Sequence, residues 1–148
     1  MRDPFVKARA ENDFRSRAAF KLVQLQEKFK LISPSDHVLG CYSTYGVQAT
    51  AQANGSIPAP TVVLSDMAHD VTGNALFDCE SILQLARGAL QMAAKTGAKK
   101  FACKVYQGEG IDEFLAAVRE VYVRVKVYKP SASRKASREV YIVGMTRL

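Results

Sequence analysis

Residues 61–73, TVVLSDMAHDVTG, constrain the fold of this chain more than any other stretch. They begin with four apolar or β-branched residues, and a continuous run of this kind is typical of a central parallel strand covered on both sides. The run ends on Ser65 and Asp66, so a carboxylate stands where the strand stops. In open α/β sheets the ligand crevice lies outside the carboxyl ends of the strands. Asp66 is therefore the first candidate functional residue, with the capping of a turn or helix as its alternative role.

The segments around this strand alternate between helical and extended patterns. Apolar spacing predicts helices at 15–29, 78–95 and 111–122, a less marked one at 47–53, and strands at 36–39, 61–64, 99–105, 123–128 and 139–146. The first three strands from residue 61 onward should pair in parallel through right-handed crossovers. The last two have no helix between them, so they should form an antiparallel pair at the sheet edge. We therefore predict one α/β domain over residues 1–148.

Length and composition narrow the class of protein. A chain of 148 residues with 48% hydrophobic and 24% charged residues is typical of a globular domain. No apolar run approaches the ~20 residues of a membrane span, and we expect no signal peptide. Cys41, Cys79 and Cys103 are widely spaced and form no C-x-x-C pair, which indicates reduced thiols in an intracellular compartment, either cytoplasm or mitochondrial matrix. With only His37 and His69 besides, we expect no metal site.

The net charge of +7 is unevenly distributed along the chain. Residues 1–30 hold eight Lys or Arg against four Asp or Glu, residues 31–94 hold one against five, and residues 95–138 hold eleven against four. A polyanion lying across one face would explain two basic ends that flank an acidic middle, although net charge alone speaks to solubility and non-specific binding. No segment is a long basic amphipathic helix with exposed aromatics, so nucleic acid is favoured over a membrane as the partner.

Four charged residues are candidates for a shared site. Asp66 ends one predicted strand, Lys104 lies near the end of the next, Glu139 opens the last, and Lys21 projects from the N-terminal helix. Lys104 interrupts the apolar run FACKV, where a buried ammonium is costly unless it is paired. Each residue alone is also compatible with an ordinary solvent-facing charge, and Lys104 could alternate with its apolar neighbours and face water. Their joint placement at strand ends favours a functional role.

Four blocks of sequence carry a family resemblance. They are DPFVKARAENDFRSRAAFKL, LSDMAHDVTG, CKVYQGEGIDEFL and KPSASRKASREVYIVG. The chain resembles the FtsJ-like ribosomal RNA methyltransferases, which use S-adenosylmethionine to methylate a ribose 2′-hydroxyl of large-subunit ribosomal RNA. The resemblance implies a seven-stranded, Rossmann-like methyltransferase sheet with an antiparallel final strand. It also implies that the family's catalytic Lys-Asp-Lys-Glu tetrad falls on Lys21, Asp66, Lys104 and Glu139.

The resemblance also implies a role for each candidate residue. A ribose hydroxyl is a poor nucleophile, and a lysine with a lowered pKa is a suitable general base for it. Lys104 would take or steer the 2′-hydroxyl proton, Asp66 would orient Lys104, and Lys21 and Glu139 would position the ribose. The cofactor-binding candidates are Gly40, Cys41, Asp66 and Met67. The RNA-binding candidates, expected to contact phosphates, are Arg15, Arg17, Lys129, Arg134, Lys135 and Arg138, each with solvated surface charge as the alternative.

The chain departs from the family pattern at the cofactor loop. The family reads close to LGAAPGGWSQ, where glycines let backbone amides approach the cofactor, and residues 39–48 here read LGCYSTYGVQ. Thr44 and Tyr45 replace the paired glycines. The chain then reaches the Asp66 strand about forty residues early, so part of one half of the sheet, including its second and third strands, is expected to be missing.

Three interpretations follow from this departure. In the first, the chain is an active methyltransferase whose full sequence contains residues that are missing here. In the second, it is a methyltransferase that binds cofactor through a remodelled loop. In the third, it is an inactive relative that keeps an RNA-binding surface and acts as a ribosome-assembly factor. We predict a methyltransferase and keep the inactive RNA-binding relative as the alternative; a small-molecule methyltransferase leaves the basic loop unexplained. The expected partner is ribosomal RNA or a large-subunit precursor, with the protein otherwise a monomer that binds neither membrane nor metal.

Overall fold

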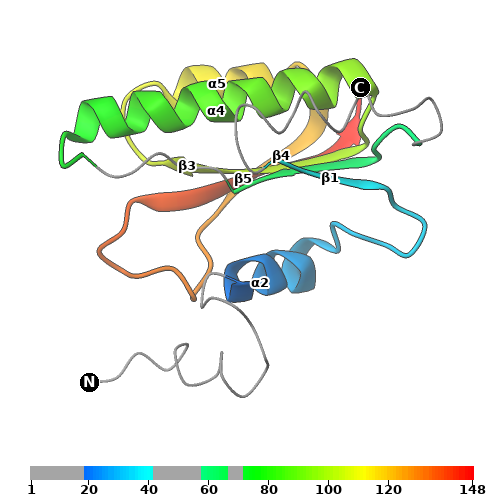
Figure 1. Ribbon diagram of the computed structural model, residues 1–148, viewed down its shortest axis with the longest axis horizontal. Coiled ribbons are helices and arrows are strands. Elements are labelled where there is room, and N and C mark those ends of the chain that lie inside the picture. Colours follow the sequence, from blue (N-terminus) through cyan, green and yellow to red (C-terminus); the bar gives the residue numbers. More distant parts are fainter. Residues whose placement is uncertain (1–18, 42–57, 67–71) are drawn as a thin grey trace.

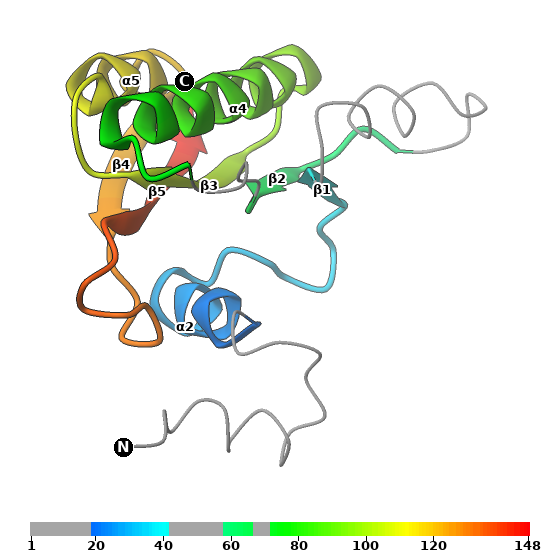
Figure 2. The same cartoon turned by 60° about the vertical axis from the view of Figure 1, so that its left-hand side comes forward.

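The computed structural model describes residues 19–41, 58–66 and 72–148, in which a five-stranded sheet lies between helices (Figure 1). The strands are β1 (Val38–Cys41), β2 (Val62–Ser65), β3 (Lys100–Tyr106), β4 (Tyr122–Tyr128) and β5 (Glu139–Arg147). The helices are α2 (Ala19–Phe29), α4 (Ala75–Thr96) and α5 (Ile111–Arg119). Helices α4 and α5 cover one face of the sheet and α2 lies on the other, as the turned view also shows (Figure 2). The predicted helix at 47–53 lies outside the described residues.

The strand order is β1-β2-β3-β5-β4. The pairs β1–β2 and β2–β3 are parallel, and β5 is antiparallel to both β3 and β4. The predicted antiparallel pair at the edge is therefore confirmed, but the prediction that β4 would pair with β3 is wrong because β5 lies between them. Burial explains this order: residues 140–144 of β5 are all buried, which suits an interior strand, whereas β4 exposes Arg124 and Lys126, which an edge strand tolerates.

The described residues form five strands, whereas the family resemblance implies seven. Strand β2 is interior and almost fully buried, as its apolar run predicts. Strands β1 and β4 are the two edge strands of the described sheet. The described residues thus form a mixed α/β sheet with an antiparallel final strand.

Alternate residues of β3 face opposite sides of the sheet. Phe101, Cys103 and Val105 are buried in the larger core cluster, beneath α4 and α5. Ala102 belongs to a smaller buried cluster on the α2 side, and Lys104, two residues later, faces that side too. Strand β3 therefore separates a large apolar core from a face that also carries charge.

Helix α4 begins three residues earlier than predicted, at Ala75. The reason is a cap: the side chain of Asn74 accepts a hydrogen bond from the Phe77 backbone N–H, which satisfies one of the free donors of the first turn. The helix is capped at its carboxyl end by Gly97. This glycine has a φ of 72°, and its N–H bonds to the carbonyl of Ala93.

The structure corrects the predicted end of the 111–122 helix. Helix α5 ends at Arg119, and Tyr122 is the first residue of β4. Tyr122 keeps helical spacing with Val118, but three valines follow it at alternate positions, and this pattern favours a strand. The Tyr122 ring is fully buried and lies against Gly144, where an added Cβ would be 2.6 Å from a ring carbon. Tyr122 is therefore a core residue that belongs to a strand.

No helix in the described part of the chain is long and apolar enough to cross a membrane. The same residues contain no group of three or more His, Cys, Asp or Glu that could hold a metal ion. The thiols of Cys41, Cys79 and Cys103 are free and buried, and burial raises the pKa of Cys103 far above its ordinary value.

Asp36 lies before β1 rather than within it, and it connects three parts of the chain. Its carboxylate accepts hydrogen bonds from the Ser33 N–H and the Thr61 hydroxyl, both at 2.8 Å, and pairs with Lys100 Nζ at 3.2 Å. The hydrogen bonds from Ser33, and then that from Thr61, hold the pKa of Asp36 well below its ordinary value. The carboxylate thus ties the start of β1 to the starts of β2 and β3.

We expect Asp36→Asn to lower the free energy of unfolding at pH 7 by on the order of 1 kcal/mol. Because the pKa is lower in the folded state, this stabilisation is present above the unfolded value of about 3.9 and is lost as the pH falls below it. Urea unfolding of wild type and variant at pH 7 and at pH 3 checks this, with Glu80→Gln, an exposed site on α4, as the control. A difference that stayed constant or grew on acidification would contradict the assignment.

Candidate functional site

Lys104 and Asp66 form an ion pair at the carboxyl ends of β2 and β3. Asp66 directly follows β2, and the register pairs Ser65 with Cys103, so the next residue of each strand is also adjacent. Lys104 Nζ lies 3.3 Å from Asp66 Oδ1 and donates to the Asp66 backbone carbonyl at 3.2 Å. The Lys104 side chain is only 13% exposed. The alternative in which Lys104 simply faces water is therefore wrong.

Lys21 and Glu139 form the second ion pair. Lys21 Nζ donates to Glu139 Oε1 at 2.5 Å, and both side chains are largely buried. Lys21 lies one turn before Leu25, which is buried against the sheet and fixes the orientation of α2. Glu139 is the first residue of β5. All four charged residues singled out by the sequence are thus paired, although they come from one helix, two strands and the end of a third strand.

Tyr141 joins this cluster, and sequence reasoning missed it. Its hydroxyl donates to Asp66 Oδ1 at 2.7 Å, and in the sheet register it lies opposite Lys104. Burial, and then the charge of Asp66, raise the pKa of Tyr141 far above its ordinary value, so the hydroxyl stays protonated. The available signal was its position two residues after Glu139, which places both side chains on the same face of β5.

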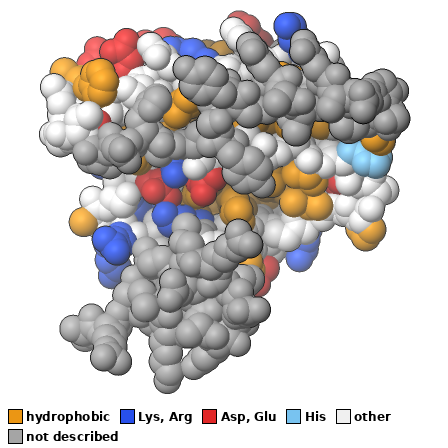
Figure 3. Space-filling view, in the orientation of Figure 1, with side chains coloured by type: hydrophobic (Ala, Val, Ile, Leu, Met, Phe, Trp, Pro, Cys, Tyr) orange, Lys and Arg blue, Asp and Glu red, His pale blue; other side chains and the backbone are white. Residues whose placement is uncertain are grey.

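The two ion pairs are neighbours. Glu139 is diagonal to Lys104 across the β3–β5 pair, and such neighbours are about 7–8 Å apart at their Cα atoms. In the view of Figure 3, acidic and basic side chains lie together near the middle of the molecule, with hydrophobic side chains beside them. We call Lys21, Asp66, Lys104 and Glu139 the charged cluster.

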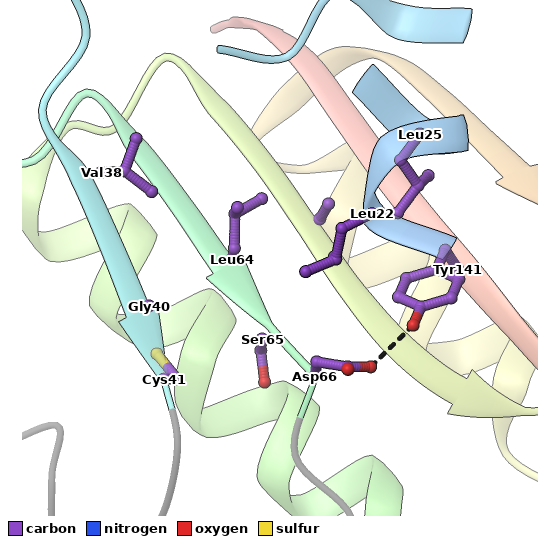
Figure 4. Close-up of a pocket in the computed structure, with 10 residues that line it drawn as sticks. Leu22, Leu25, Val38, Gly40, Cys41, Leu64, Ser65, Asp66 and Tyr141 are labelled. Carbon is purple, nitrogen blue, oxygen red and sulfur yellow. Dashed lines mark hydrogen bonds between the residues drawn. The ribbon is translucent and has the colours of Figure 1, made fainter. Parts of the chain in front are cut away.

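A pocket of about 420 Å³ lies beside the charged cluster on the α2 side of the sheet. Its apolar walls come from Leu22, Leu25, Val38, Leu64 and Ala102. Asp66 stands at one end of it, bonded to Tyr141, while the side chains of Val38 and Leu64 point into the same space (Figure 4). The volume is in the range typical of small-molecule sites. A small molecule bound here would have an apolar surface on one side and a carboxylate at its end.

Three of the predicted cofactor-binding residues line this pocket and one is not described. Gly40 and Asp66 line it, and Gly40 lies on the same face of β1 as Val38, where the lack of a side chain lets a ligand approach the backbone. Cys41 also lines it, but its side chain is buried in the core on the α4 side, so only its backbone is available. Met67 and the remainder of the glycine-poor loop, residues 42–48, lie outside the described residues.

The basic loop at residues 129–138 connects β4 to β5 and leads directly into Glu139. The side chains of Arg134, Lys135 and Arg138 are exposed. Lys129 is used differently, because its amine donates to the backbone carbonyl of Ser137 and closes the neck of the loop. The RNA-binding candidates Arg15 and Arg17 lie outside the described residues.

Comparison with known proteins identifies the class. A crystal structure described as a ribosomal RNA methyltransferase of Plasmodium falciparum superposes with a TM-score of 0.69, covering 91% of this chain and 99% of that one at 18% identity. The two chains therefore share a fold. The model of the FtsJ-like methyltransferase family matches residues 43–147, and the chain belongs to this family.

Relatives with established names agree with this assignment. The ribosomal RNA large subunit methyltransferase E of Pseudomonas fluorescens is 32% identical, covering 96% of this chain and 88% of the relative. That of Methanosarcina mazei is also 32% identical, covering 97% and 69%. The first alignment spans 185 positions although this chain has 148 residues, so the relative contains residues without a counterpart here. This agrees with the early arrival at the Asp66 strand.

Proposed function

We propose that residues 1–148 form one FtsJ-like methyltransferase domain that transfers a methyl group from S-adenosylmethionine to a ribose 2′-hydroxyl of large-subunit ribosomal RNA. The observation that carries this proposal is the charged cluster at the carboxyl ends of β2 and β3, beside a pocket of small-molecule size. The names of the relatives in Pseudomonas fluorescens and Methanosarcina mazei support ribosomal RNA as the substrate.

The described pocket fits the chemistry of the methyl donor. S-adenosylmethionine supplies a methyl group bound to a positively charged sulfur, and it also carries an aromatic base whose ring faces pack against apolar groups. Asp66 offers a negative charge at one end of the pocket, with 36% of its side chain exposed, and the apolar walls suit an aromatic group. Gly40 permits a close approach to the backbone of β1.

Lys104 is proposed to handle the proton of the reaction. As the ribose 2′-oxygen forms its bond to the methyl carbon, the carbon–sulfur bond breaks and the hydroxyl proton must leave. Lys104 Nζ accepts or steers this proton, and Asp66 holds the amine at the edge of the pocket. Lys21 and Glu139, which form the second ion pair, position the ribose by hydrogen bonds.

Ribosomal RNA or a large-subunit precursor is the proposed partner, and the protein is proposed to be an intracellular monomer apart from it. Exposed Arg134, Lys135 and Arg138 stand on the loop that leads into Glu139, so phosphates bound there would lie next to the charged cluster. Arg138, one of the proposed phosphate contacts, directly precedes Glu139, one of the proposed catalytic residues.

Methyl transfer from radiolabelled S-adenosylmethionine to large-subunit particles tests the proposal. The product should resist alkaline hydrolysis at the modified nucleotide, because a 2′-O-methyl group blocks attack on the adjacent phosphate. A labelled base instead of a labelled ribose would contradict the proposed reaction. The replaced glycines of residues 39–48 suggest an inactive RNA-binding relative as the alternative, and calorimetric titration with S-adenosylmethionine distinguishes it from an active enzyme. RNA binding with no detectable cofactor binding would favour the inactive relative.

A prediction follows for the basic loop. Replacing Arg134, Lys135 and Arg138 together by alanine should weaken RNA binding about equally for different sequences, because binding to phosphates carries no sequence information. The plot of log affinity against log salt should flatten by about one unit for each phosphate that the variant no longer binds.

Fluorescence titration with a ribosomal RNA fragment at several KCl concentrations measures this effect. The matched control replaces Arg87, Lys95 and Arg119 by alanine. This removes the same amount of positive charge from the exposed surfaces of α4 and α5. An unchanged slope in the loop variant, or an equal change in the control, would assign these side chains to ordinary solvated surface.

A further inference from the structure

Helix α2 contacts the basic loop through Gln24. The side-chain amide of Gln24 donates to the Ser131 hydroxyl at 2.6 Å and accepts a hydrogen bond from the Ala132 backbone N–H at 2.9 Å. The two partners are 107 and 108 residues away in sequence. A single side chain thus satisfies both a hydroxyl and a backbone donor of the loop.

The contacted part of the loop is buried, although its cationic part is exposed. Pro130 and Ser133 are buried and Ala132 is completely so, and the Ser133 N–H closes a turn on the Pro130 carbonyl at 3.0 Å. Arg134 and Lys135 follow immediately and are exposed. The proposed phosphate-binding side chains therefore stand on a segment that is held against the protein body.

Gln24 and Lys21 form hydrogen bonds at the two ends of the segment that connects β4 to β5. They are three residues apart on α2 and so lie on the same side of the helix. Lys21 holds Glu139, directly after the loop, while Gln24 holds Ser131 and Ala132 near its start. Any shift of α2 would move both contacts together.

We propose that Gln24 is a positioning residue that holds the basic loop in the geometry in which RNA phosphates and the charged cluster are engaged together. This inference rests on the proposed function, because it concerns how the same RNA substrate is held. Gln24 contacts the loop rather than the reacting atoms. Loss of the Gln24 side chain leaves every cationic side chain present but removes the two hydrogen bonds that hold the loop. RNA binding must then order the loop.

Gln26 provides a matched control on the same helix. Its amide makes the same two kinds of hydrogen bond, accepting from the Ile32 N–H at 2.8 Å and donating to the Ile32 carbonyl at 2.7 Å, in the segment that leads to β1. Gln26→Ala therefore removes an equivalent pair of bonds away from the basic loop. Gln24→Glu is the rescue variant, since a carboxylate accepts from the Ala132 N–H and from a rotated Ser131 hydroxyl.

The first experiment needs no RNA. Hydrogen exchange at the Ala132 amide, measured by NMR on the full chain, should be faster in Gln24→Ala by at least fivefold, near wild type in Gln24→Glu, and unchanged in Gln26→Ala. Wild-type protection at Ala132 in Gln24→Ala would overturn the inference without touching the proposed function.

The second experiment titrates a ribosomal RNA fragment over a range of KCl concentrations. We expect Gln24→Ala to bind about fivefold to tenfold more weakly than Gln26→Ala, with the salt slope of the wild type, because every phosphate-binding side chain is still present. A merely structural role would lower the melting temperature and leave affinity unchanged. Equal affinity in the two variants overturns the inference alone, whereas a wild type without RNA binding overturns the proposed function and the inference with it.

Discussion

Lys104→Ala should lower the rate of methyl transfer to ribosomal RNA by about 10²–10⁴-fold, the usual effect of removing a general base. The reason is the position of the amine, which is 13% exposed and lies 3.3 Å from Asp66 Oδ1 at the end of the pocket. The protein should remain folded, because Asp66 is partly exposed and keeps its hydrogen bond from Tyr141. Radiolabel transfer under single-turnover conditions, with thermal melting alongside, measures both effects.

Lys100→Ala is the matched control for this variant. Lys100 lies on the same face of β3, four residues earlier, and pairs with Asp36 away from the pocket. Its loss should change the melting temperature but leave the single-turnover rate within about twofold of wild type. If folded Lys104→Ala retained the wild-type rate, Lys104 would have no part in the proton transfer.

The sequence predicts the parts of the fold that depend on local pattern. The unbroken apolar run before Asp66 predicts an interior strand, and β2 is one. The insertion of β5 between β3 and β4 was not predicted, because strand pairing depends on contacts between residues about forty apart, such as Phe101 with Gly144. Tyr122 was assigned to the helix because it lies at the boundary between α5 and β4. An apolar residue at such a boundary fits both the helical spacing before it and the strand alternation after it.

The candidate site divides in the same way. Lys104 and Asp66 could be found because a charge in or after an apolar strand is conspicuous, and the pairing of each with an opposite charge follows from the structure. Tyr141 could not be distinguished from an ordinary core aromatic, since only the position of its hydroxyl beside Asp66 reveals a polar role. Gln24 is a common helical residue, and its partners lie more than a hundred residues away.

Asp66→Asn tests the other half of the Lys104 pair. The amide has the size of the carboxylate and still accepts from the Tyr141 hydroxyl, so packing should be preserved while the negative charge is lost. Lys104 then keeps the backbone carbonyl of residue 66 at 3.2 Å but loses its charged partner, and the pocket loses the negative charge that would attract a cationic methyl donor. We expect the methyl transfer rate to fall by about 10²-fold or more, with weaker binding of S-adenosylmethionine in calorimetry.

Tyr141→Phe separates the charge of Asp66 from its orientation. This variant removes the 2.7 Å hydrogen bond but leaves the carboxylate and its pair with Lys104, so the expected loss is only about tenfold or less. Because burial and the charge of Asp66 raise the pKa of Tyr141, its hydroxyl is protonated throughout the assay range, and the pH–rate profile should keep its wild-type shape. A lost alkaline limb in Tyr141→Phe would mean that this tyrosine titrates during the reaction. A larger loss in Tyr141→Phe than in Asp66→Asn would mean that the hydroxyl, and not the carboxylate, is the group on which the site depends.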